Sequence, residues 1–182
     1  MRKRPGRKPV FTRRQVIDAA LAEGIGSFTL RAVAERLGVK ATALYRVFSS
    51  RQELQLAAMN AISRDIEPDP RLRTWQEALR DVVNRYWDMC SRYPEAATVI
   101  LTQPEAFGMA LPRIAAIVER LAELGIPAGT DGAAFALDFV VDMTLETYVS
   151  IQPYLTPDAN GRTGLDRLTQ ILGGRPDLFG MQ

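Results

Sequence analysis

The residues most able to do chemistry in this chain lie in one short segment between Lys40 and Phe48. If this segment is helical, Leu44 and Phe48 are four residues apart and share its buried side. The side chains left facing outward are then Thr42, Ala43, Tyr45 and Arg46. Exposed hydroxyl and guanidinium groups on a short helix are typical of a segment that enters the major groove of DNA.

The preceding segment positions that short helix. An apolar stripe with helical spacing comes first, formed by Leu30, Val33, Ala34 and Leu37. Gly38 follows, where the end of a helix favours a residue that tolerates positive φ. Two short helices joined by a glycine turn form the helix-turn-helix pattern, whose second helix reads DNA.

The charge of the chain is unevenly distributed. Residues 1–54 hold twelve lysines and arginines against four acidic residues, whereas residues 55–182 hold eleven against seventeen. A basic head on an acidic body indicates that the head alone binds nucleic acid. Residues 1–10 have the composition of a mobile basic arm, which could follow phosphates, enter a minor groove or serve only as a solubilising tail.

The composition argues against several classes of function. The chain has no histidine, which removes the commonest general base, histidine metal sites and the usual catalytic triads. Cys90 is the single cysteine, so an internal disulfide is impossible and a reducing compartment is expected. With no signal peptide and no long apolar run, we expect a soluble cytoplasmic protein with no catalytic residues, metal or cofactor.

Helical periodicity and capping signals predict an all-α fold. Capping boxes at Thr12, Ser50 and Thr74 predict helices that run to about Glu23, Ile66 and Tyr93. Further helices are expected over 94–101, from Pro112 to about Leu124, over 131–151 with a stop at Pro153, and over 165–172, with an irregular segment over 104–111. The expected organisation is a basic arm (1–10), a three-helix helix-turn-helix domain (11–54), a connecting helix and linker (55–69) and an α-helical domain (70–182).

The run LRAVAERLGVKATALYRVFSSRQEL resembles the DNA-binding domain of the tetracycline-repressor (TetR) family of bacterial transcription regulators. The resemblance is specific over about residues 11–60 and weaker beyond, where TWQEALR, RYP and LAELGIP look like that family's effector and dimerisation domain. It implies a cytoplasmic homodimer that binds a palindromic double-stranded operator and usually represses. A small molecule in the C-terminal domain then releases the DNA.

The resemblance also assigns roles to single residues. It implies that Tyr45 contacts phosphate or a thymine methyl, and that Thr42 and Arg46 read base edges, because arginine can bridge guanine O6 and N7. Lys40 and Arg51 suit phosphate contacts, and Ala43 lies on the same face. Thr29 caps the preceding helix, and Arg31 could reach backbone or a base, although a solvated surface role is the alternative for Arg31 and Arg51. Val47 stands where the family often has a phosphate-binding aromatic or histidine; either it packs inward or the helix register is shifted by one.

The acidic part holds the candidate effector residues. An apolar or aromatic effector is expected to contact the side chains of Trp87, Phe107, Phe139 and Met143, although core packing is the alternative for each. Asp138, Asp142 and Glu146 share one helix face. They could attract a cationic ligand, pair across a subunit contact with arginines such as Arg113, Arg120 or Arg167, or face water; we favour the last two because burying carboxylates is costly.

The 131–151 helix and the 165–172 helix are the expected dimer surface, because two helices from each subunit make a four-helix bundle. Two rival functions stay open. One is a DNA-binding architectural dimer without an effector, which a fully packed C-terminal core would favour. The other is an α-helical enzyme, for which a carboxylate pair on the 131–151 helix is the only catalytic candidate.

Overall fold

The computed structural model describes residues 11–64, 66–157 and 159–163, and within them the chain is helical, with no strand. The basic arm and the predicted 165–172 helix lie outside the described residues. In the described part the helices are α1 (Arg13–Glu23), α2 (Leu30–Arg36), α3 (Ala41–Leu44), α4 (Arg51–Ile62), α5 (Trp75–Arg92), α6 (Ala96–Thr102), α7 (Pro104–Glu123) and α8 (Gly129–Leu155). The all-α prediction is confirmed.

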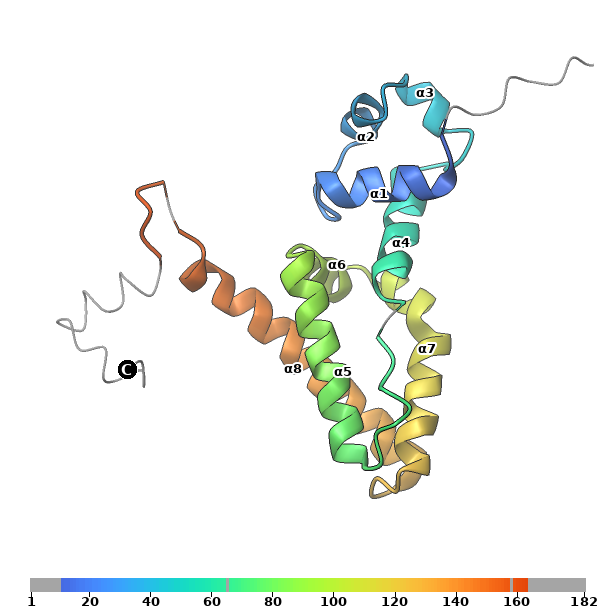
Figure 1. The fold of residues 1–182 in the computed structure, drawn as a ribbon, viewed down its shortest axis with the longest axis vertical. Coiled ribbons are helices and arrows are strands. Elements are labelled where there is room, and N and C mark those ends of the chain that lie inside the picture. The colour runs from blue at the N-terminus through green and yellow to red at the C-terminus, as the bar shows by residue number, and fades with distance from the viewer. Residues whose placement is uncertain (1–10, 65, 158, 164–182) are drawn as a thin grey trace, which may run out of the picture.

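The chain forms a small head, made of α1 to α3 with the start of α4, above a larger helical body (Figure 1). Large apolar side chains fill the head, and those that are almost fully buried include Phe28, Val33, Leu44, Phe48 and Leu54. In the body, α8 packs against α5, α6 and α7. Burying these faces removes apolar surface from water, which is the main force holding such helices together.

The fourth helix joins the two parts. Its first turns pack on α1 in the head, and its C-terminal part packs on α7 in the body. Any movement of this helix relative to the body therefore moves the head.

Local capping signals define most helix starts. The Thr12 and Thr74 capping boxes form as predicted, with the N3 side chain of each returning to the cap residue. At Ser50 only half of the box forms: the hydroxyl accepts from Glu53 N–H, but the Glu53 carboxylate accepts from Ser49 N–H at 2.7 Å instead. Gly38 has φ +67°, the left-handed conformation that the turn requires.

Three predicted boundaries were wrong. Pro104, not Pro112, occupies the first turn of α7, so 104–111 is helical. Pro112 has no N–H to donate to the Gly108 carbonyl, one turn earlier. Both residues are exposed, so water can bond to that carbonyl and the helix continues. Pro153 likewise lies inside α8 and does not end it.

The third wrong boundary is the end of α4. This helix ends at Ile62, with Ser63 as its C-cap, and not near Ile66.

Among the described residues, no helix is both long and apolar enough to cross a membrane. The same residues contain no group of three histidine, cysteine or acidic side chains placed to hold a metal ion.

Candidate DNA-reading head and effector cavity

The short third helix presents a polar outer face. Its α-helical turn ends at Leu44, and N–H bonds from Arg46, Val47 and Phe48 continue the coil to Phe48. Leu44 and Phe48 are buried, whereas Thr42, Tyr45 and Arg46 are exposed, with 57 % of the Tyr45 surface accessible. The predicted orientation is therefore confirmed for these three side chains. Ala43 differs, since it is half-buried and packs against the core.

An arginine of α1 fixes the end of this segment. Arg13 Nη1 donates to the Val47 carbonyl at 2.8 Å, and the guanidinium lies 4.0 Å from the centre of the Phe48 ring. The same group pairs with Glu53 on α4 at 3.3 Å. Val47 packs inward, which resolves its predicted alternatives. Sequence reasoning missed Arg13 because its partners are more than thirty residues away.

Three other predicted contact residues are at the surface of the head. Lys40 is exposed and is the N-cap residue of α3, with no side-chain capping bond. Thr29 caps α2 by accepting from Ala32 N–H at 3.1 Å. Arg31 is exposed and pairs with Glu35, one turn along α2, at 2.8 Å. That pair is exposed on both sides and contributes little to stability, so it can open to another anion.

Arg51 points into the head. Its Nη2 donates to the Gly26 carbonyl at 2.6 Å and its Nε to the Phe28 carbonyl at 2.9 Å. The guanidinium also lies 4.7 Å from the centre of the Phe28 ring. These contacts hold the turn between α1 and α2 against α4.

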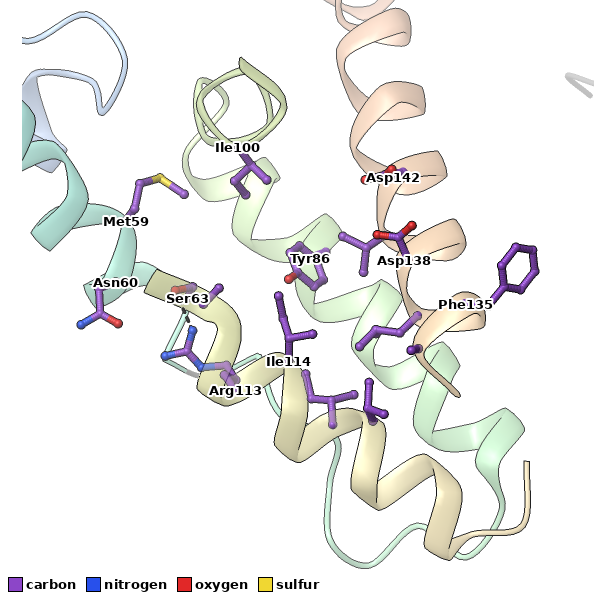
Figure 2. A pocket seen from close by; sticks show the side chains of 16 residues that line it. Met59, Asn60, Ser63, Tyr86, Ile100, Arg113, Ile114, Phe135, Asp138 and Asp142 are labelled. Carbon is purple, nitrogen blue, oxygen red and sulfur yellow. Dashed lines mark hydrogen bonds between the residues drawn. The ribbon is translucent and has the colours of Figure 1, made fainter. Parts of the chain in front are cut away.

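The body contains a cavity of about 410 Å³ with mainly apolar walls (Figure 2). Its lining side chains come from α4 to α8, and they are Met59, Asn60, Ser63, Tyr86, Ile100, Ala110, Arg113, Ile114, Ile117, Val118, Ala134, Phe135, Leu137, Asp138, Val141 and Asp142. A partly apolar cavity of this size with a few polar groups is typical of a small-molecule site. Met59, Asn60 and Ser63 belong to the end of α4, so the cavity borders the helix that carries the head.

The side chains predicted to bind an effector lie elsewhere. Trp87 is directed to Tyr148, with ring centres 5.3 Å apart in an edge-to-face arrangement. Phe139 and Met143 lie on the exposed side of α8. None of these three lines the cavity, whose α8 wall is formed by Ala134, Phe135, Leu137, Asp138, Val141 and Asp142. The side chain of Phe107 is outside the described part of the structure.

Two carboxylates and one guanidinium reach the cavity. Asp138 and Asp142 project from α8, and Arg113 projects from α7, where its Nη1 donates to Ser63 Oγ at 2.9 Å (Figure 2). Among the described residues, neither aspartate has a hydrogen bond or an ion pair. Burial raises the pKa of Asp142, and the neighbouring Asp138 and Glu146 raise it further. The predicted pairing of these carboxylates with arginines across a subunit contact stays a prediction. Asp138, Asp142 and Glu146 are exposed, as expected of groups that face water.

Several large apolar side chains of α8 are left exposed by the described residues, and they are Phe135, Phe139, Met143, Val149, Tyr154 and Leu155. Phe135 and Phe139 stack on each other, with ring centres 6.2 Å apart. Exposed carboxylates such as Glu146 lie on the same helix. A group of exposed apolar side chains of this kind is typical of a protein interface.

The body also touches the head through one glutamate. Glu95, at the N-terminus of α6, accepts N–H bonds from Gly26 at 2.6 Å and Ser27 at 3.1 Å. A Cβ on Gly24 would lie 2.8 Å from Glu95 Oε2, and the φ of +105° at this position also favours glycine. A Cβ on Gly26 would lie 3.2 Å from the Glu95 Cβ and would crowd it. Sequence reasoning gave Glu95 no role, because its partners are about seventy residues away.

The sequence model of bacterial regulatory proteins of the tetR family matches residues 17–58, which contain α2, α3 and most of α1 and α4. The head of this chain is therefore similar to the DNA-binding part of TetR-family regulators. The family and the similar structures below are regulators, so the chain is grouped with transcription regulators. No curated protein matches the chain at a significant level.

Solved structures of TetR-family regulators share the whole fold. BioQ from Mycobacterium smegmatis is 26 % identical, with a TM-score of 0.67 over 90 % of this chain and 93 % of BioQ. BioQ with its double-stranded DNA operator is 22 % identical, with a TM-score of 0.64 over 93 % and 97 %. TetR-Q116A from Acinetobacter baumannii AYE, in complex with minocycline, is 23 % identical, with a TM-score of 0.63 over 92 % and 98 %.

Proposed function

We propose that this chain is a cytoplasmic transcriptional regulator that acts as a repressor. It binds a palindromic operator as a homodimer and releases it when a small molecule fills the cavity. The single observation that carries the proposal is the exposed polar face of α3 in a family-matched head. The similarity to a regulator with its operator and to another with minocycline supports both halves of the proposal.

In this proposal Thr42 and Arg46 read base edges in the major groove. Lys40 contacts phosphate, and Tyr45 contacts phosphate or a thymine methyl. Ala43 leaves room for the groove floor. Arg31 reaches the DNA backbone after leaving Glu35, and Thr29 supports it by capping α2. Arg51 takes a positioning role in place of a phosphate contact, because its guanidinium holds the α1–α2 turn.

The homodimer is proposed from the exposed apolar side chains of α8. One short recognition helix gives little affinity, whereas two that are held about 34–36 Å apart can read a palindrome. Covering these side chains with a second copy would also remove exposed aromatic rings from water.

Effector control is proposed from the position of the cavity. A ligand there touches the end of α4, and α4 begins in the head. The boundary that we propose, between the domain 11–54 and the connecting helix and linker 55–69, falls within this helix. A ligand that fits one position of α4 better than another shifts the population of head arrangements. The cavity is also the observation that disfavours the architectural alternative, for which a filled core is expected.

The test begins with selection of bound fragments from the native genome, which gives the operator. Arg46→Ala is then expected to weaken binding to the operator by about 1–3 kcal/mol and to weaken binding to random DNA much less. Arg80→Ala, which removes an exposed charge of the body, is the matched control and should change neither. Equal losses on operator and random DNA would refute the base-reading role of Arg46.

A further inference from the structure

The cavity wall on α8 carries negative charge that no described residue neutralises through an ion pair. Asp138 and Asp142 are one turn apart and both line the cavity. The described structure gives neither of them an ion pair. Arg113, the one cationic side chain among the lining residues, comes from α7 and is bound to Ser63. The α8 wall therefore presents an uncompensated pair of carboxylates to whatever occupies the cavity (Figure 2).

The remaining walls are suited to an apolar body. Ile100, Ile114, Ile117 and Val141 supply aliphatic surface, and Tyr86 supplies an aromatic ring. A ring beside two carboxylates favours an organic cation, because both its face and the carboxylates attract positive charge. A small inorganic ion would leave most of the apolar surface of the cavity without a partner.

We propose that the effector cavity takes an organic cation, an apolar molecule with a protonated amine or quaternary ammonium group, and that Asp138 and Asp142 are its counter-charges. The inference rests on the proposed function, since it names the ligand class of the same cavity. The effector proposed here is charged, whereas the sequence predicted an apolar or aromatic one.

Electrostatics within α8 support the same conclusion. Burial, followed by the charges of Asp138 and Glu146, raises the pKa of Asp142, so the ligand-free wall is a site of mutual repulsion. A cation between these groups relieves the repulsion, a neutral ligand leaves it, and an anion increases it. The wall therefore discriminates by ligand charge.

A matched set of three probes tests the proposal: 4-phenylbutylamine, 4-phenylbutan-1-ol and 4-phenylbutanoate, titrated calorimetrically into the full chain without DNA. These molecules share an apolar body and differ at one end in charge. A charge-assisted contact of ordinary strength predicts that the amine binds roughly ten- to a hundredfold more tightly than the alcohol. The carboxylate is expected to bind most weakly.

The variant that carries the test is Asp138→Asn with Asp142→Asn, which keeps side-chain size and removes the repulsion. It should lose about tenfold or more in amine affinity and keep its alcohol affinity. Glu119→Gln, an exposed carboxylate of α7 outside the cavity, is the control and should leave both affinities unchanged. An unchanged melting temperature of the double variant shows that it is folded.

Several outcomes would overturn the proposal. These are equal affinity for amine and alcohol, a preference for 4-phenylbutanoate that Arg113→Gln abolishes, no binding of any probe, or a double variant that keeps its amine affinity. Failure of the proposed function is separate, because it would appear as absence of operator binding by the wild-type chain.

Discussion

The contact between Glu95 and the α1–α2 turn gives a sharp prediction about how the head is held on the body. Glu95→Ala removes a charged acceptor from the amides of Gly26 and Ser27. Hydrogen bonds to charged groups contribute about 1.5–3 kcal/mol each when well buried. Because Glu95 is only half-buried, water competes, and we expect a total loss of about 1–2 kcal/mol in the free energy of unfolding. Glu95→Gln keeps one acceptor oxygen and should lose about half as much.

The assay is urea unfolding together with amide hydrogen exchange. In Glu95→Ala the Gly26 and Ser27 amides should exchange faster, while amides in the middle of α5 keep their protection relative to global stability. Glu119→Ala, on the exposed side of α7, is the control for loss of a carboxylate.

A double-mutant cycle separates the contact between Glu95 and Gly26 from general losses of stability. Gly26→Ala places a Cβ 3.2 Å from the Glu95 Cβ and should destabilise the wild-type chain. In the Glu95→Ala background that Cβ contact stays, but the contacts of the new methyl with Glu95 Oε2 at 3.3 Å and Cδ at 3.4 Å are gone, so Gly26→Ala should cost less. Additive losses, with unchanged exchange at Gly26 and Ser27, would refute the contact.

The pH dependence has a definite sign. Burial raises the pKa of Glu95, but hydrogen bonds from Ser27 and Gly26 and the charge of Arg51 outweigh it, so the net pKa lies below the ordinary value of 4.5. A lowered pKa in the folded state means that the contribution is complete above pH 4.5 and is lost as the pH falls through the lowered value. The difference in stability between wild type and Glu95→Ala should therefore be constant near neutral pH and shrink in acid.

Two further predictions follow from the body. Burial raises the pKa of the Cys90 thiol to about 11, so a thiol reagent at pH 8 should label the native chain far more slowly than the urea-unfolded chain, as measured by mass spectrometry; equal rates would contradict its burial. Phe139→Asp places a charge among the exposed apolar side chains of α8 and should shift the chain toward monomer in sedimentation, with weaker operator binding; an unchanged dimer would place the interface elsewhere.

Much of the fold could be predicted because its signals are local. The Thr12 and Thr74 boxes and Gly38 each depend on neighbours within four residues, and each forms as expected. Pro112 was misread because a proline at the first turn of a helix and a proline on its exposed side produce the same sequence pattern. Solvent exposure, which the sequence does not state, decides between them.

The candidate site was predicted only in part, for the same reason. The outward face of α3 follows from the positions of Leu44 and Phe48, so Thr42 and Arg46 were found correctly at the surface. The contacts of Arg13 join segments far apart in the chain and have no local signature. The cavity lining depends on how α8 is turned against its neighbours, and Phe139 and Asp138, which are about 100° apart around the helix, face different surroundings.

The central claim is that two copies of the head read one symmetric DNA site. The most direct measurement is a footprint of the selected operator combined with the mass of the complex. The account predicts an even number of chains on a palindrome whose half-sites are centred about 10–10.5 base pairs apart, or a multiple of that spacing. A single chain on an asymmetric site, or protection that Thr42→Ala and Arg46→Ala leave unchanged, would contradict it.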